Sequence, residues 1–158
     1  MDASNSTIDV LVKGSPKTIS ECQRVLENLY DSYNGYRACA EDCKDLELEI
    51  LFQKVATNRF RFIEELSSVL RSDMGIEPVT SGSAMEAVHD SWINVKAWFN
   101  DGLDKAEIFP ELHRGETHLI DHYITALSEP EHLTDKVWRV LQEQLKSIKE
   151  QDASLYAL

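Results

Sequence analysis

Apolar residues recur alternately three and four positions apart over long stretches of this chain of 158 residues. That spacing places them on one face of an α-helix, and helices with such a face bury it against one another in a bundle. The first stretch shows the pattern over its whole length, at Ile19, Cys22, Leu26, Leu29, Tyr33, Tyr36, Ala40 and Cys43. The spacing therefore predicts an all-α fold.

Capping and turn residues divide the chain into five predicted helices. Ser15 and Pro16 are start signals for the first helix, because serine caps a helix and proline suits its first turn. Ser83 and Glu86 have capping-box spacing before a shorter third helix. The predicted helices cover residues 16–43, 45–74, 85–99, 104–127 and 135–155.

The stretch between the second and third helices determines the topology. It runs from Gly75 to Gly82, contains Pro78 and is too long for a tight turn between antiparallel helices, so we interpret it as a crossover connection. Two antiparallel hairpins of long helices, joined by a crossover with an extra short helix, are typical of a ferritin-like four-helix bundle. Residues 16–158 then form one domain after an N-terminal extension, residues 1–15. A five-helix bundle of another connectivity would show the same apolar stripes.

Charge and composition exclude several classes of protein. The chain carries 28 acidic and 16 basic residues, a formal net charge of −12, without a concentrated basic patch, which disfavours binding to nucleic acid or anionic membranes. No apolar run approaches the roughly 18 residues of a membrane helix. The start of the sequence also lacks the basic segment and long apolar stretch of a secretory signal. We therefore expect a cytoplasmic protein.

The three cysteines, Cys22, Cys39 and Cys43, are an odd number for a disulfide framework, and reduced thiols fit a cytoplasmic location. Cys39 and Cys43 lie four apart on one predicted helix, but the sequence supplies no further soft-metal ligands nearby. We interpret all three as small buried side chains rather than as a metal or redox site.

Three predicted helices carry an ionisable residue where the heptad requires an apolar one: Arg59, Glu116 and Asp152. A buried carboxylate or guanidinium is costly unless it is paired, so we expect Arg59 and Glu116 to meet inside the bundle. Arginine suits this role because its planar fork matches a carboxylate. We expect Asp152 about one turn away. A tyrosine hydroxyl is expected to complete the network, from Tyr30, Tyr33 or Tyr123.

Several short segments resemble a known family in their order and spacing. They are Gly35-Tyr36-Arg37-Ala38, Ala40-Glu41-Asp42, Arg61-Phe62, Glu65-Leu66, Glu77-Pro78, Ser81-Gly82-Ser83, Ser91-Trp92 with Lys96, and Arg114-Gly115-Glu116. Over residues 18–156 the chain is similar to the bacterial ferritin-like family called domain of unknown function 2383. The resemblance implies a ferritin-like bundle and no established activity.

A catalytic ferritin-like protein holds two iron ions with a Glu from each of two helices and a Glu-x-x-His motif from each of the others. The central stripe positions hold Leu29 and Tyr33, then Arg59 and Phe62, and then Glu116 on successive long helices. The last helix offers Lys149 and Asp152 at the Glu-x-x-His spacing, or Glu150 off the stripe, and no histidine. Only two carboxylates remain, and an arginine takes the place of the metal charge. The sequence therefore predicts no catalytic centre and no cofactor, with a buried polar core in place of the iron site.

Different classes of function stay open. The first is a non-catalytic bundle that acts through a protein partner or through self-association, for instance as a homodimer, with a role in stress physiology by analogy alone. The second is an iron-handling protein or oxidase with an atypical site around Glu116 and Asp152. His118 and His122 have metal-compatible spacing, but they lie off the apolar stripe, which favours a solvated face. The third is a protein that holds a small anion at Arg59.

Overall fold

A computed structural model describes residues 14–83 and 105–156 of the protein. Within these residues the chain forms four α-helices and a 3₁₀ turn, with no strand: α2 (Pro16–Asp42), α3 (Leu46–Met74), α5 (Lys105–Ala126), η1 (Pro130–His132) and α6 (Asp135–Tyr156). The all-α prediction is confirmed. None of the described helices combines the length and the apolarity needed to cross a bilayer. The predicted short helix at 85–99 and most of the predicted N-terminal extension lie outside the described residues.

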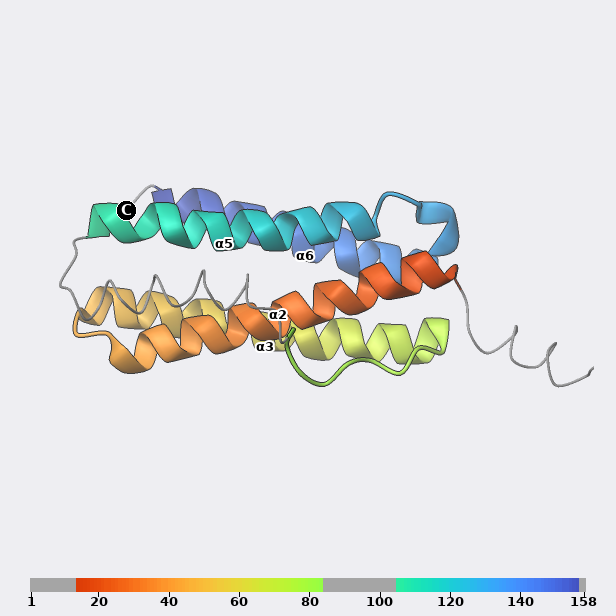
Figure 1. Ribbon diagram of the computed structural model, residues 1–158, viewed down its shortest axis with the longest axis horizontal. Coiled ribbons are helices and arrows are strands. Elements are labelled where there is room, and N and C mark those ends of the chain that lie inside the picture. Colours follow the sequence, from red (N-terminus) through yellow and green to blue (C-terminus); the bar gives the residue numbers. More distant parts are fainter. Residues whose placement is uncertain (1–13, 84–104, 157–158) are drawn as a thin grey trace, which may run out of the picture.

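The four long helices pack as two antiparallel hairpins, α2 with α3 and α5 with α6 (Figure 1). α2 also contacts α5, and α3 also contacts α6, so each helix has two neighbours around a common interior. α3 and α5 run in the same direction along the bundle (Figure 1). The end of α3 and the start of α5 therefore lie at opposite ends of the bundle, which distinguishes this arrangement from an up-down-up-down bundle.

Local sequence signals account for where the first two helices begin and end. α2 begins at Pro16, and the Ser15 side chain accepts a hydrogen bond from a backbone N–H of the first turn at 3.1 Å. Asp45 caps α3 in the same way, also at 3.1 Å. α3 ends at Gly75, whose φ of 67° lies in the left-handed region that residues with a Cβ adopt only with strain.

The connection after α3 is attached to α2 at two places. The Gln23 side chain donates to the Glu77 carbonyl at 2.9 Å and accepts from the Val79 N–H at 3.0 Å. Farther along α2, Asp31 accepts from the backbone N–H of Ser83 at 3.3 Å and from its hydroxyl at 2.5 Å. The Ser83 hydroxyl, which the sequence predicted as a helix cap, thus donates to α2. These bonds hold the connection against the first hairpin.

The hydrophobic core consists of two clusters, one toward each end of the bundle. The cluster on the side of the α5–α6 turn includes Leu26, Leu66, Leu70, Tyr123 and Leu141. The cluster on the side of the α2–α3 turn includes Tyr36, Leu48, Phe52, Ile108 and Leu112. Both clusters include residues of α2, α3 and α5, and α6 contributes to the first cluster alone. The residues that separate the clusters therefore lie across the bundle.

Trp138 and Phe109, which the sequence places on apolar stripes, are less buried than the residue before each of them. Trp138 is 41% exposed, whereas Val137 beside it is fully buried. Phe109 is half-buried next to the fully buried Ile108. A strict heptad drifts by about 20° per repeat relative to an ideal α-helix. Near the helix ends, the residue beside the predicted one therefore takes the inward position.

Gly115 lies inside α5, where a Cβ would meet no neighbouring atom within 4 Å. We expect Gly115→Ala to raise the free energy of unfolding by about 1 kcal/mol, because alanine has the higher helix propensity. Denaturant titration measures the change. The matched substitution Gly75→Ala should destabilise the protein, since the φ of 67° at that position strains any residue with a Cβ. Effects of the same sign at the two positions would contradict this explanation.

Candidate functional site

A layer of polar side chains separates the two hydrophobic clusters, and every long helix contributes to it. α2 supplies Ser32, α3 supplies Arg59, α5 supplies Glu116 and α6 supplies Gln151. The nearest core residues on either side are Ala56 and Phe62 in α3, and Leu112 and Leu119 in α5. The layer thus lies at one level of the bundle, where the four helices face one another.

Arg59 is fully buried, and each of its three guanidinium nitrogens has a partner. Nη2 donates to Oε2 of Glu116 in an ion pair. Nε donates to Oγ of Ser32 at 3.1 Å, and Nη1 donates to the side-chain oxygen of Gln151 at 3.0 Å. Burial by itself lowers the pKa of Arg59, but the Glu116 carboxylate and nearby phenols offset this effect, so the pKa is raised overall. The guanidinium therefore stays charged inside the bundle.

Glu116 is 2% exposed, and both of its carboxylate oxygens are engaged. Oε2 binds Arg59, and Oε1 accepts a hydrogen bond from the Tyr36 hydroxyl at 2.6 Å. The Tyr36 ring also lies within cation–π range, with its centroid 5.9 Å from Cζ of Arg59. Burial and the adjacent carboxylate raise the pKa of Tyr36 well above its usual value, so the hydroxyl keeps its proton. The layer thus holds one balanced pair of charges.

Asp152 lies at the edge of the layer and pairs with a histidine. Its carboxylate is 2.8 Å from Nδ1 of His113, whose side chain is 43% exposed. Arg59 contacts Gln151, the residue before Asp152, in place of Asp152 itself. Asp152 is 9% exposed and therefore buried. It pairs with His113, about one turn before Glu116 on α5, rather than with the guanidinium itself.

A second polar group lies inside the bundle around Gln144, which is 1% exposed. Its side-chain oxygen accepts from the Tyr123 hydroxyl at 2.7 Å, and its nitrogen donates to the Phe62 carbonyl at 3.2 Å and to Glu65 at 3.0 Å. Burial raises the pKa of Tyr123. Through Gln144, α6 is bonded to both α5 and α3.

Comparison with known proteins gives a family but no function. A model of the family described as Domain of unknown function (DUF2383) matches residues 17–129, which is most of the chain. The chain belongs to this family. No curated protein matches it, and no solved structure matches it either. The DUF2383 match includes Ser32, Tyr36, Arg59 and Glu116, and it ends before α6.

The ion pair of this DUF2383 protein is where the sequence predicted it, but the tyrosine is a different one. Arg59 and Glu116 meet inside the bundle, as expected. Tyr33, the tyrosine proposed for the polar core, is half-buried, and its ring packs against Phe60 with centroids 5.5 Å apart. The choice of Tyr33 was wrong because Tyr33 and Tyr36 both lie on the apolar stripe, and spacing alone does not show which hydroxyl reaches the next helix.

The weaker metal candidates do not converge on one site. His118 and His122 lie side by side on α5, with ring centroids 4.8 Å apart. They face away from Glu116, since successive residues of an α-helix turn by about 100°. Burial, and after it the charge of His118, lower the pKa of His122. Glu116 is held by Arg59 on the opposite side of the helix.

The residues of the layer do not fit a di-iron centre. Such a centre needs carboxylates and imidazoles that converge on two cations. Here the Arg59 guanidinium occupies the space between helices, and Phe62 provides a phenyl ring at the other predicted ligand position. The centre of this DUF2383 bundle therefore carries its own cation.

Two members of the layer are uncharged, and the pattern of ionisable stripe residues did not predict them. Ser32 lies beside the predicted stripe, three residues after Leu29 and four before Tyr36, so helical spacing gave a usable signal for it. Gln151 lies beside the stripe, and nothing in its spacing distinguishes it from a surface glutamine.

Proposed function

We propose that this protein is a non-catalytic bundle of the ferritin-like kind, which acts through protein contacts and carries a structural ion pair at its centre. The observation that supports this most is the closed Arg59–Glu116 pair, with both side chains buried and every charged atom engaged. A group that binds or activates a substrate needs a free face toward accessible space. Neither partner of this pair has one.

The proposed role of the pair is to fix the register of the helices. If α3 slides against α5 by one turn, about 5.4 Å, Arg59 and Glu116 separate and each leaves a charge unpaired in the core. The bonds from Arg59 to Ser32 and Gln151 extend the same constraint to α2 and α6. One relative placement of the four helices therefore satisfies both charges.

Elemental analysis distinguishes this proposal from the metal-binding alternative. That alternative uses Glu116 and Asp152, whose carboxylates are engaged by Arg59 and His113. We expect protein purified without added metal to contain no stoichiometric iron. A content of about two irons per chain would overturn the proposal, because it would require a di-iron site in the bundle.

Exposed apolar side chains on α3 supply the surface for protein contacts. Leu46, Ile50 and Phe60 are 69%, 56% and 44% exposed. With Gln53 and Thr57 between them, they form a row along one side of the helix, since residues three and four apart are neighbours on a helix surface. Such a row favours association with a partner helix.

The row is complementary to itself, which favours a second copy of the chain as the partner. Two α3 helices placed antiparallel, with their Gln53 residues opposite each other, bring Leu46 of one copy against Phe60 of the other. The same placement sets Ile50 against Thr57. A two-fold axis repeats each of these contacts, which is the usual symmetry of a homodimer.

Ile50→Lys tests the dimer, because a lysine in the centre of the row places a charge in the proposed interface. We expect the wild-type protein to be a dimer by light scattering after size-exclusion chromatography, and Ile50→Lys to be a monomer. Ile124→Lys is the matched control, since Ile124 is 49% exposed on α5, away from the row. A monomeric wild-type protein, or equal effects of the two substitutions, would contradict self-association through α3.

A cytoplasmic location is part of the same proposal. No disulfide links Cys22, Cys39 and Cys43, which supports a reducing compartment. Burial raises the pKa of Cys22 to about 12, so its thiol is a poor nucleophile and suits a packing role. A role in stress physiology rests on the likeness to ferritin-like proteins alone.

A further inference from the structure

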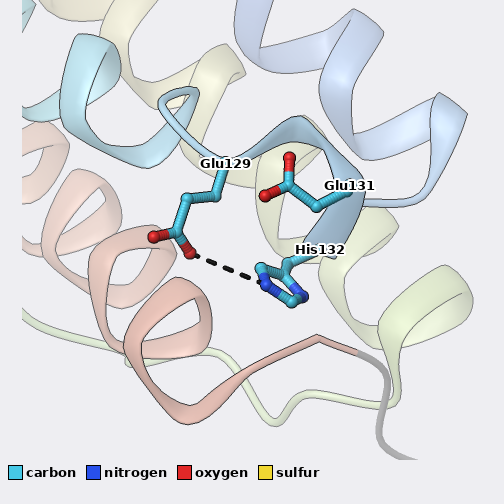
Figure 2. Close-up of side chains that lie close together, drawn as sticks. All are labelled: Glu129, Glu131 and His132. Atoms are coloured by element: carbon cyan, nitrogen blue, oxygen red, sulfur yellow. Dashed lines mark ion pairs between the residues drawn. The ribbon is translucent and has the colours of Figure 1, made fainter.

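Three potential metal ligands meet in the turn between α5 and α6, at the end of the bundle and away from the Arg59–Glu116 pair. Figure 2 shows Glu129, Glu131 and His132 on this turn, with an ion pair drawn between Glu129 and His132. One ligand atom from each residue lies within 4.8 Å of the other two. Among the described residues, no other three His, Cys, Asp or Glu side chains come this close together.

The 3₁₀ conformation of the turn explains why Glu129 and His132 lie close together. Residues Pro130–His132 form the 3₁₀ turn η1, and residues three apart in such a turn lie one above the other. Glu129 and His132 have that spacing, and Oε2 of Glu129 lies 3.8 Å from Nε2 of His132. Glu131 is the intervening residue that completes the group.

The backbone of the turn is held in place by its own hydrogen bonds and by α3. The His132 N–H donates to the Glu129 carbonyl at 3.1 Å, and the Leu133 N–H donates to the Pro130 carbonyl at 3.0 Å. Thr134, which follows, donates from its hydroxyl to Asp73 on α3 at 3.4 Å. A ligand that binds here therefore meets a backbone that is already ordered, so little ordering entropy is lost.

The group borders an open pocket. The pocket has a volume of about 430 Å³ and is lined by Gly14, Ser15, Glu131, His132, Leu133 and Thr134. An ion held by the three side chains would keep its remaining coordination positions on this accessible side, where water or a small ligand completes the shell. This open space and the imidazole distinguish the group from a simple acidic patch.

We propose that Glu129, Glu131 and His132 form a surface site for a divalent transition-metal ion, with zinc as the reference ion. Two carboxylates and an imidazole suit Zn²⁺ and its neighbours, whereas Ca²⁺ and Mg²⁺ prefer oxygen ligands alone. Ligands about 2.1 Å from a tetrahedral ion lie about 3.4 Å from one another. The ligand atoms, which lie within 4.8 Å of one another, therefore need to approach by up to about 1.4 Å, which rotation of partly exposed side chains provides.

Lys17 competes with the ion for one ligand. Its Nζ lies 3.5 Å from Oε1 of Glu129, and the two side chains are 65% and 36% exposed. An exposed pair of this kind contributes little to stability. A divalent ion that binds Glu129 thus has to displace only this weak contact with Lys17. Removal of the lysine charge should therefore tighten metal binding.

Calorimetric titration of the metal-free protein with Zn²⁺ tests the site. The titration uses a His118→Gln, His122→Gln background, so that the imidazole pair on α5 binds no ion. We expect one Zn²⁺ per chain, with affinity about tenfold or more weaker in the His132→Gln and Glu131→Gln variants. Lys17→Gln should bind Zn²⁺ more tightly than the background protein. Each of these side chains is at least partly exposed, so the fold is expected to persist, and circular dichroism checks it.

NMR of the histidine ring protons locates the ion independently of affinity. Zn²⁺ should shift the His132 ring signals first, before those of His113. His113→Gln is the matched control and should leave the Zn²⁺ affinity unchanged. Absence of binding, unchanged affinity in His132→Gln, or a first shift at His113 would each overturn the proposed site. None of these results depends on the role assigned to the Arg59–Glu116 pair.

Discussion

Arg59→Met is expected to lower the free energy of unfolding by about 3 to 5 kcal/mol, because it leaves the Glu116 carboxylate buried without its counter-charge. The carboxylate keeps its hydrogen bond from Tyr36, but a phenol does not replace a full positive charge. Chemical denaturation at neutral pH measures the loss. The loss should exceed that of any single substitution at the protein surface, because a surface substitution leaves no charge buried.

The double change Arg59→Met, Glu116→Leu should recover most of that loss, because it removes both charges together. The remaining deficit is expected at Tyr36, whose buried hydroxyl then lacks an acceptor, so the further change Tyr36→Phe should recover about 1 to 3 kcal/mol. Failure of the double variant to recover stability would contradict the pairing as the source of the effect.

Arg71→Met is the matched control for the loss of an arginine charge. Arg71 pairs with Glu77 at 3.2 Å, but the side chains are 60% and 80% exposed. We expect this substitution to change stability by less than about 1 kcal/mol. If Arg71→Met lowered the free energy of unfolding as much as Arg59→Met, burial of the Arg59–Glu116 pair would not explain the size of the loss.

The sequence predicts the helices and the ion pair because both depend on simple rules. Apolar spacing determines which helix faces are buried, and two opposite charges on buried faces have one way to avoid a large desolvation cost. Arg59 and Glu116 satisfy these conditions whatever the order of the helices in the bundle. The prediction therefore depended on burial and charge alone.

The partners of the pair could not be predicted in the same way. The choice between Tyr33 and Tyr36 depends on how α2 is rotated against α5. The two tyrosines lie on nearly the same face of α2, so a small rotation decides which hydroxyl reaches α5. His113 joins Asp152 across the α5–α6 hairpin, although the two residues lie 39 positions apart. Such contacts depend on the packing of whole helices and leave no local pattern.

The ligand group at the α5–α6 turn was not predicted either, for a different reason. Glu129, Glu131 and His132 are adjacent in sequence, so distance along the chain did not hide them. A stretch of polar residues with a proline is typical of any helix connection. Only the 3₁₀ conformation at 130–132 shows that Glu129 and His132 lie one above the other, with Glu131 close to both.

Buried ionisable side chains of the folded protein keep their protons at a pH where the same groups in the unfolded chain lose them. Tyr36 and Tyr123 are fully buried, and burial raises the pKa of both phenols above their usual value of 10.0. Burial likewise raises the pKa of the Cys22 thiol from 9.0 to about 12. In the unfolded chain these groups ionise at their usual values, whereas in the folded chain they stay protonated.

The protein should therefore lose stability steeply above about pH 9, because the folded state then binds more protons than the unfolded state. The stabilising contribution is fully present below the unfolded-state pKa values and is lost as the pH rises toward the raised folded-state values. Each group that ionises only on unfolding lowers stability by about 1.4 kcal/mol per pH unit. Above about pH 10, the two tyrosines together should contribute about 2.7 kcal/mol per pH unit.

Urea titrations between about pH 8 and pH 11 measure this slope, at pH values chosen to bracket the usual phenol and thiol pKa values of about 9 to 10. Tyr36→Phe and Tyr123→Phe should each flatten it by about 1.4 kcal/mol per pH unit, even though each also lowers stability at neutral pH by removing a buried hydrogen bond. Phe52→Leu is the control, since it perturbs the same core without removing a proton. Its stability curve should run parallel to that of the wild-type protein. A slope that survives both tyrosine substitutions would show that the buried phenols do not keep their protons in the folded state.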